Sequence, residues 1–183
     1  MQKVITLFKR DYEGTRLVYD ELVEGAEWVI EGEGWPTEKI DGTSVLIRDD
    51  KLYKRYDAKK GRQPPPNFEP AQDPDHITGH WPGWLPVGDG PEDKWHREAW
   101  EKGGKDLPNG TYELIGPKVQ GNKYQLQQHT LRLHGDVVLE SVPRDFAGLR
   151  EYLECNPVYE GIVWHHEDGG MVKLKRKDFG FKW

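Results

Sequence analysis

A lysine, an acid and a glycine stand close together near residue 40 and define the first chemistry that this sequence could perform. Lys39, Asp41 and Gly42 form the string Lys-x-Asp-Gly. A lysine amine that has lost its proton is a nucleophile, and a nearby acid can orient it. The string alone is weak evidence for a nucleophile, because a single lysine of this kind is more often an ordinary surface residue.

Three further pieces follow in order along the chain. Glu113 lies between apolar residues in a predicted strand, and Glu160 opens a predicted hairpin. Lys173 and Lys175 lie on the return strand, where side chains two residues apart share a face. Each piece has an ordinary explanation, since strands often carry an edge carboxylate and lysines often protect a sheet edge. Their joint occurrence in this order favours a single site.

The charge distribution is uneven. The net charge is −6, yet five of the last eleven residues are basic. A compact basic strip on an acidic chain favours a site for a phosphate-rich ligand over a broad nucleic-acid coat. A solvated C-terminal tail explains the charge alone equally well.

Bulk composition predicts one ordered domain over residues 1–183. Hydrophobic residues make up 35% of the 183 residues and charged residues 32%, which is typical of a soluble globular protein. The single cysteine, Cys155, excludes an internal disulfide and a cysteine-cluster zinc site. No apolar run is long enough for a membrane helix, and the N-terminus lacks a secretory signal, so we expect a cytoplasmic protein without membrane contact.

The predicted elements indicate an α+β fold dominated by antiparallel strands. One helix is expected over residues 145–154, where apolar residues share a face and Asn156-Pro157 follows. Two hairpins are expected, one turning at Asp49-Asp50 and the other at residues 167–170. The expected strands are residues 4–8, 28–30, 43–47, 52–56, 111–115, 136–141, 161–165 and 171–175.

Residues 57–107 differ from the rest in being rich in proline and tryptophan. This segment contains Pro64-Pro65-Pro66 and four tryptophans, Trp81, Trp84, Trp95 and Trp100. We interpret it as an ordered insertion that packs onto the main sheet, with a short helix near residues 95–102. Its tryptophans either form local core, which is the commoner case, or form an RNA-contacting wall.

The ordered motifs resemble those of the covalent nucleotidyltransferase superfamily of polynucleotide ligases and mRNA-capping guanylyltransferases. Thr37-Glu38-Lys39-Ile40 is also similar to the nucleophile motif of phage ligases that repair nicked duplex RNA. More narrowly, the chain from about Thr37 onward resembles the small RNA ligase 1-type family. The strings that carry this likeness are residues 78–84, 93–98, 116–122, 160–166 and 173–180.

This resemblance implies a nucleotidyltransferase domain of the ligase type, without a C-terminal oligonucleotide-binding barrel. It implies that Lys39 attacks the α-phosphate of ATP and that Asp41 orients it. Lys173 and Lys175 would neutralise charge on the phosphate, and with a divalent cation they would favour an unprotonated nucleophile. Glu38, Ile40 and Gly42 would line the nucleotide beside Lys39.

The remaining implied roles concern the ribose, the metal and the RNA. Arg55 would contact the ribose or the RNA 5′-phosphate, with the adjacent Lys54 as an alternative. Glu113 would bind the ribose or the metal shell, and Glu160 would hold Mg²⁺ or Mn²⁺. The usual aromatic that stacks on the base has no obvious counterpart here, His134 being a weak candidate.

Taken together, these roles imply an ATP-dependent RNA ligase that acts as a monomer. It would join RNA 5′-phosphate and 3′-hydroxyl ends through Lys39-AMP and then an adenylated RNA end. Two alternatives stay open, a capping-type guanylyltransferase and a catalytically silent RNA-binding module of the same fold.

Overall fold

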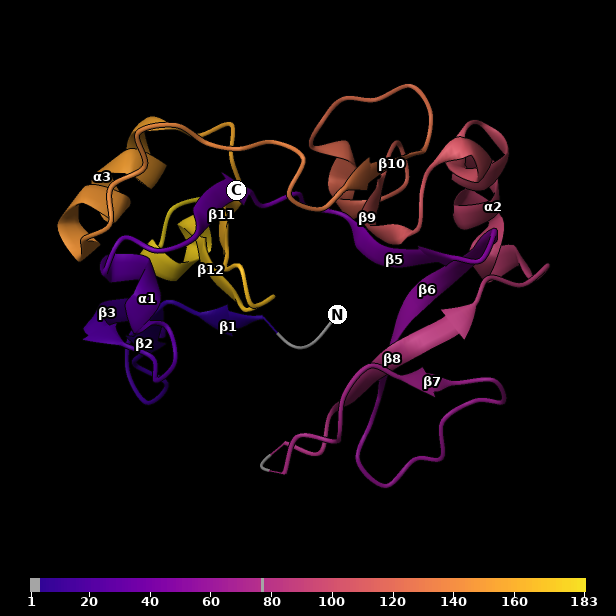
Figure 1. Ribbon diagram of the computed structural model, residues 1–183, viewed down its shortest axis with the longest axis horizontal. Coiled ribbons are helices and arrows are strands. Elements are labelled where there is room, and N and C mark those ends of the chain that lie inside the picture. The colour runs from indigo at the N-terminus through magenta and orange to yellow at the C-terminus, as the bar shows by residue number, and fades with distance from the viewer. Residues whose placement is uncertain (1–3, 77) are drawn as a thin grey trace. The chain divides into compact units, whose positions relative to one another are not determined.

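The computed structural model describes residues 4–76 and 78–183, which form two compact units (Figure 1). Unit 1 consists of residues 41–76 and 78–134, and unit 2 consists of residues 4–40 and 135–183. Strands outnumber helices in both units, and nearly all strand pairs are antiparallel. The predicted α+β class is therefore confirmed.

Unit 1 is built on one six-stranded antiparallel sheet with the order β10-β9-β5-β6-β8-β7. Asp49 and Asp50 connect β5 to β6 with φ angles of 51° and 56°, the left-handed conformation that a tight hairpin turn requires. This confirms the first predicted hairpin. The strands are β5 (Thr43–Arg48), β6 (Lys51–Ala58), β7 (Glu69–Pro70), β8 (Trp81–Pro86), β9 (Gly110–Ile115) and β10 (Thr130–Leu133).

One face of this sheet forms the hydrophobic core of unit 1. Val45, Tyr112 and Leu114 are buried there and pack with Ala99 of α2 (Lys94–Glu101). Alternation of apolar and polar residues along β5 and β9 places the apolar set on this face. Short 3₁₀ turns, η1 (Pro91–Asp93), η2 (Gly104–Asp106) and η3 (Gln120–Asn122), complete the unit.

The proline- and tryptophan-rich segment contributes directly to unit 1. It supplies β7, β8 and α2, so the expected short helix is confirmed. Trp84 is buried within β8, while Trp95 and Trp100 pack against the core. Trp95 also stacks on His129, with ring centroids 4.6 Å apart. The local-core interpretation holds for these three tryptophans, whereas Trp81 is partly exposed.

Unit 2 is built on a four-stranded sheet with the order β1-β12-β11-β4. Its strands are β1 (Ile5–Thr6), β4 (Trp35–Glu38), β11 (Gly161–His165) and β12 (Met171–Lys175); β1 runs parallel to β12. The β11–β12 pair confirms the second predicted hairpin. A separate antiparallel pair is formed by β2 (Phe8–Arg10) and β3 (Val18–Leu22).

The core of unit 2 lies on one face of the four-stranded sheet. Ile162, Trp164 and Leu174 are fully buried there and pack with Leu149 and Leu153. The last two belong to α3 (Phe146–Cys155), which confirms the predicted helix. The Asp145 side chain caps α3 by accepting the Gly148 N–H at 2.9 Å. The helix α1 (Glu27–Ile30) and the 3₁₀ turn η4 (Arg176–Phe179) also belong to this unit.

Three of the predicted strands were wrong or incomplete. Residues 28–30 lie in α1 instead, because a three-residue apolar run does not distinguish a strand from a buried helical turn. Residues 136–141 make only an isolated bridge, Thr37 to Val138, along β4. Pro36 of β4 has no N–H to donate, which limits backbone hydrogen bonding between β4 and residues 136–141. Residues 4–8 divide between β1 and β2, whose partners are β12 and β3.

Candidate active-site residues

Lys39 directly follows the last residue of β4, Glu38. Its backbone N–H donates to the carbonyl of Gly161 at 2.9 Å, which extends the β4–β11 ladder by one residue. Gly161 is required at this position, because a Cβ atom there would lie 2.2 Å from the carbonyl oxygen of Leu174. The backbone of Lys39 is therefore held by strand pairing even though it lies outside the strand.

The side chain of Lys39 forms an ion pair with Glu160. The Nζ atom lies 2.6 Å from Glu160 Oε2, and the two side chains are 20% and 9% exposed, respectively. Glu160 directly precedes β11, and its carbonyl accepts the N–H of Arg176 at 2.9 Å. A charge-assisted hydrogen bond of this length fixes the position of the amine better than solvent contacts would. Two of the predicted site residues, 121 positions apart, are thus in direct contact.

Lys173 and Lys175 lie on the same face of the sheet as Lys39. Strand pairing puts Gly161 opposite Lys175 and Val163 opposite Lys173, while Lys39 is the residue beside Gly161. Across the three strands, Gly161 lies between Lys39 and Lys175, and it has no side chain to separate the two lysines. Lys173 lies two residues before Lys175 on the same face of β12. The other face of these strands is the apolar core, so alternation alone separates the cations from the core.

Lys39 and Lys175 act electrostatically on Lys173. The pKa of Lys173 is lowered from its ordinary value, first by burial and then by the positive charges of Lys175 and Lys39. Glu160 and Asp178 act in the opposite direction but do not reverse the shift. Three neighbouring amines on one face therefore create a local positive potential, which is suited to holding phosphate groups.

The basic residues at the C-terminus do not act as one strip. Arg176 is buried, and its Nε donates to the carbonyl of Lys182 at 3.0 Å. Asp178 is also buried; it accepts the backbone N–H of Lys175 at 2.8 Å and pairs with Arg10. Arg176 and Asp178 therefore hold the chain after β12 in place, while Lys173 and Lys175 are the cations on the site face.

In unit 1, polar residues line the face of the sheet opposite its core. Glu113 of β9 lies opposite both Ser44 of β5 and Arg132 of β10. Arg55 of β6 lies opposite Trp84 of β8, and its guanidinium is 5.3 Å from the Trp84 ring centroid. Burial lowers the pKa of Arg55 from its ordinary value, against the attraction of Asp57 and Glu113. Arg55 and Glu113 therefore share one polar face.

The structure distinguishes Arg55 from Lys54, which the sequence left open. Lys54 lies on the core face beside Val45, and its amine is 2.5 Å from the carboxylate of Asp93. Asp93 is almost fully buried and also accepts the N–H of Gly88 at 2.7 Å. Lys54 is thus part of the packing beneath α2, and Arg55 is the residue on the face that carries Glu113.

Residues that the sequence analysis did not assign complete this polar face. Arg132 and Ser44 flank Glu113, and the Ser44 hydroxyl is buried without a hydrogen-bond partner among the described residues. His134, the weak base-stacking candidate, lies with Nε2 3.3 Å from Glu113 Oε2. Arg132 and Ser44 were missed because β10 was not predicted and because strand register is invisible in the sequence.

Asp41 and Gly42 belong to unit 1, whereas Glu38, Lys39 and Ile40 belong to unit 2. The backbone N–H of Asp41 donates to the hydroxyl of Tyr124 at 2.9 Å. A Cβ atom at position 42 would lie 2.4 Å from the carbonyl of Leu114, so glycine allows the close approach to β9. Glycine at position 42 is therefore a packing requirement. Ile40 is buried.

The donor set for a divalent cation is sparse in the described part of the chain. Residues 4–76 and 78–183 contain no group of three His, Cys, Asp or Glu side chains arranged to hold a metal ion. Mg²⁺ commonly takes only one or two protein carboxylates and completes its shell with water and substrate phosphates. Glu160 would supply one such carboxylate, in exchange for its ion pair with Lys39. None of the helices in these residues is long and apolar enough to cross a bilayer.

The protein has an α+β fold in which Lys39, the candidate nucleophile, is paired with the buried carboxylate of Glu160. Lys173 and Lys175 lie on the same face of the sheet. A family model described as RNA ligase 1 matches residues 101–183. RNA ligase 1 of Pongo abelii is 26% identical, and the match covers 81% of this chain and 68% of the relative. RNA ligase 1 of Danio rerio is 31% identical over 57% of this chain, and the match covers 42% of that relative.

A mouse relative, RNA ligase 1 of Mus musculus, is 26% identical over 80% of this chain and 67% of its own length. The chain thus spans about two thirds of the length of the mammalian relatives that it matches. The chain is therefore similar to the RNA ligase 1 family, whose members are named as ligases. The family resemblance that the motifs indicated is confirmed.

Proposed function

We propose that this chain is an ATP-dependent RNA ligase that carries AMP on Lys39. The observation that carries the proposal is the Lys39–Glu160 pair, 2.6 Å long, on a sheet face shared with Lys173 and Lys175. A nucleophilic amine among cations suits attack on a phosphate, because the cations stabilise the charge that develops in the transition state. The similarity to RNA ligase 1 proteins supports RNA as the substrate class.

The reaction consists of three displacements at phosphorus. The unprotonated Nζ of Lys39 attacks the α-phosphate of ATP, a phosphorus–nitrogen bond forms, and pyrophosphate leaves. An oxygen of the RNA 5′-phosphate then attacks that phosphorus, the bond to Lys39 breaks, and the amine regains a proton. Finally a 3′-hydroxyl attacks the RNA phosphate, loses its proton, and releases AMP. Positioning and charge neutralisation are sufficient for each step.

The chain's own residues would supply that positioning. Glu160 holds the amine of Lys39 in position, while Lys173 and Lys175 attract the phosphates of ATP. A bound Mg²⁺ or Mn²⁺ would neutralise phosphate charge, with Glu160 as its protein ligand. Glu38, Ile40 and Asp41 would set the position of Lys39 in the chain.

We propose nucleotide or RNA contacts for the residues of unit 1 as well. Arg55 and Glu113 share one polar face. Ser44 lies on the strand between theirs, and its hydroxyl has no hydrogen-bond partner within residues 4–76 and 78–183. Such a face offers donors and acceptors to a ribose or a phosphate, with Glu113 as a second candidate metal ligand and Gly42 allowing close backbone approach. The chain as a whole would then be one nucleotidyltransferase domain of the ligase type.

Labelling with ATP tests the proposal directly. Wild-type protein incubated with α-³²P-labelled ATP and Mg²⁺ or Mn²⁺ should retain label after denaturing electrophoresis, and mass spectrometry should find AMP on Lys39. Lys39→Arg is the matched control, because it keeps a cation near Glu160 but removes the nucleophile. An unlabelled wild type with both metals would overturn the proposal and favour a silent RNA-binding module.

Competition and ligation complete the experiment. Unlabelled GTP should not compete with ATP at equal concentration; preferential labelling by GTP would instead indicate a guanylyltransferase. The labelled protein should then join a 5′-phosphate to a 3′-hydroxyl in RNA. Comparing a nicked duplex with a broken stem-loop would identify the preferred substrate.

A further inference from the structure

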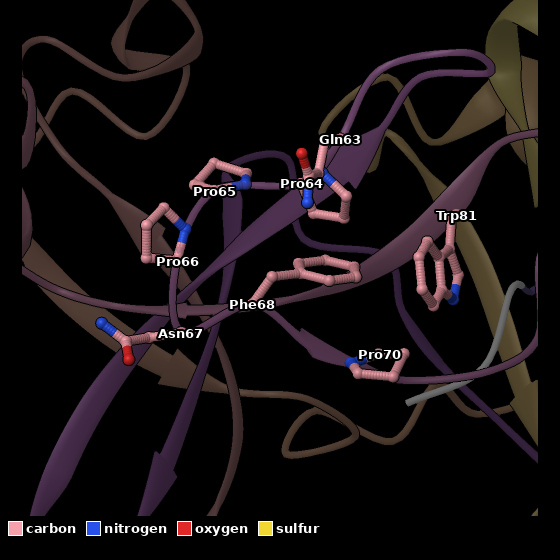
Figure 2. Close-up of a pocket in the computed structure, with 8 residues that line it drawn as sticks. All are labelled: Gln63, Pro64, Pro65, Pro66, Asn67, Phe68, Pro70 and Trp81. Carbon is pink, nitrogen blue, oxygen red and sulfur yellow. The ribbon is translucent and has the colours of Figure 1, made fainter.

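An open groove lies in unit 1, between the connection from β6 to β7 and the start of β8. It has a volume of about 660 Å³ and is lined by prolines, two aromatic rings and two amides, with no ionisable side chain (Figure 2). Its lining includes residues 64–66, Phe68, Pro70 and Trp81. None of the predicted catalytic or nucleotide-binding residues lies in it.

The two aromatic rings of the groove are held in fixed orientations. The indole N–H of Trp81 donates to the carbonyl of Gln72 at 2.9 Å. Phe68 meets Trp81 edge to face, with centroids 5.2 Å apart, and it meets Tyr56 in the same way at 5.9 Å. Both Phe68 and Trp81 remain partly exposed. The groove therefore offers rigid aromatic surfaces that a ligand can reach.

The sequence is adapted to keep Phe68 in this place. Gly83 of β8 packs against its ring, and a Cβ atom there would lie 2.4 Å from Phe68 Cε2 and 2.4 Å from the carbonyl of Glu69. Asn67, with φ of 65°, reverses the chain just before Phe68. The local backbone is thus arranged around the exposed ring rather than burying it.

Positive charge borders the groove. Ala58 lies opposite Trp81 in the β6–β8 pair, so the chain that leaves β6 passes beside the approach to Trp81. That chain carries Lys59, Lys60 and Arg62, all exposed. The stem of Lys60 packs against Gly79, where a Cβ atom would lie 2.7 Å from Lys60 Cβ. Three exposed cations therefore lie on the segment that leads from β6 into the groove.

We propose that this groove binds unpaired RNA. Bases would stack on Phe68 and Trp81, and the backbone phosphates would lie along Lys59, Lys60 and Arg62. An uncharged aromatic floor with a basic border matches the chemistry of single-stranded nucleic acid, in which each nucleotide combines a flat π surface with a negative charge. The inference rests on the proposed function only in taking RNA as the substrate. It assigns strand recognition to residues of unit 1 that have no part in the proposed chemistry of Lys39.

Binding of a fluorescein-labelled 12-nucleotide single-stranded RNA, measured by anisotropy without ATP, tests the groove. Trp81→Ala should weaken binding about tenfold, the size expected for the loss of one base–aromatic contact. Trp81→Phe should restore most of the affinity, because a smaller ring still stacks. Tyr12→Ala, which removes an exposed aromatic ring from unit 2, is the matched control and should leave the Kd within twofold.

Salt dependence and duplex RNA separate stacking from charge. Lys60→Ala and Arg62→Ala should each reduce the slope of log K against log salt by about 0.7. Fully paired duplex RNA should bind Trp81→Ala as it binds wild type, since its bases are not free to stack. Equal losses for single-stranded and duplex RNA would overturn the proposal, as would an unchanged affinity in Trp81→Ala.

Crosslinking provides a measurement that does not depend on a folded variant. Single-stranded RNA containing 5-iodouridine, irradiated with wild-type protein, should yield crosslinked peptides that contain Phe68 or Trp81. Crosslinks confined to other peptides would overturn the proposal that the groove binds RNA. A wild-type protein that binds no single-stranded RNA would overturn it as well. Absence of Lys39-AMP would remove the ligase proposal alone, so the two failures are distinguishable.

Discussion

The two sheets use their polar faces in different ways. In unit 2 the charged groups are concentrated, since Lys39 and Glu160 are in contact and Lys173 and Lys175 come from one strand. In unit 1 the polar residues are spread across neighbouring strands, with Glu113, Ser44 and Arg55 on β9, β5 and β6. A concentrated set suits bond making at one phosphorus atom, whereas a spread set suits recognition of an extended ligand. The comparison predicts larger kinetic effects from substitutions in unit 2.

Replacing Lys39 should have the largest effect. Lys39→Ala and Lys39→Arg should both reduce formation of the AMP adduct to background, because neither offers a free amine. Quantification of label after electrophoresis gives the measurement. Substantial labelling of Lys39→Arg would show that another residue is the nucleophile. The comparison between the polar faces of the two sheets would then lose its basis.

Glu160→Gln should slow adduct formation by about a hundredfold, the size typical of losing one precisely placed charged contact. Glutamine has nearly the same shape but carries no charge to pair with Lys39. Single-turnover labelling at saturating ATP measures the rate. Glu160→Asp, which keeps the charge on a shorter side chain, should retain more activity; if glutamine retains more, hydrogen bonding and not charge is the contribution of Glu160.

Lys173→Met and Lys175→Met should each slow the same step by about tenfold to a hundredfold, because each removes a cation from the phosphate-facing side. Lys177→Met is the matched control, since Lys177 is an exposed lysine in η4 that makes no described contact with the sheet face. A loss in the control as large as in Lys173→Met would indicate a general charge effect and weaken the concentrated-site interpretation.

Arg55→Ala and Lys54→Ala should separate function from stability in unit 1. Arg55→Ala should raise the KM for ATP or RNA about tenfold, which is the loss of one charged hydrogen bond. Lys54→Ala leaves the buried carboxylate of Asp93 without its cation and should lower the free energy of unfolding by about 3 kcal/mol. Steady-state kinetics measures the KM, and urea denaturation measures the free energy of unfolding. The reverse pattern would exchange the roles assigned to these neighbours.

Asp145→Ala should have the smallest effect. It removes the cap of α3 and should lower the free energy of unfolding by about 1 kcal/mol. The rate of adduct formation should stay unchanged, because α3 packs on the core face of the unit 2 sheet. Asp145→Asn, which can still cap, is the control. A kinetic defect in Asp145→Ala would show that the two faces are coupled.

Much of the fold could be predicted where the local signal is strong. The Asp49-Asp50 turn, the hairpin at residues 167–170 and the capped helix α3 all follow from turn and cap chemistry. Short strands such as β4 and β10 were missed, because four residues carry little periodicity. Residues 28–30 were predicted as a strand for the same reason, although they form a helical turn.

The candidate site divides in the same way. The sequence by itself determined which residue types are present and their order, because Lys39, Glu160 and the Lys173/Lys175 pair form recognisable strings. Strand alternation also predicted that Lys173 and Lys175 share a face. Only the tertiary structure decided that Glu160 contacts Lys39, that Arg55 rather than Lys54 faces Glu113, and that Trp81 lines a groove while Trp84 is buried. Register between strands distant in sequence controls these outcomes, since a shift of one residue moves every side chain to the opposite face.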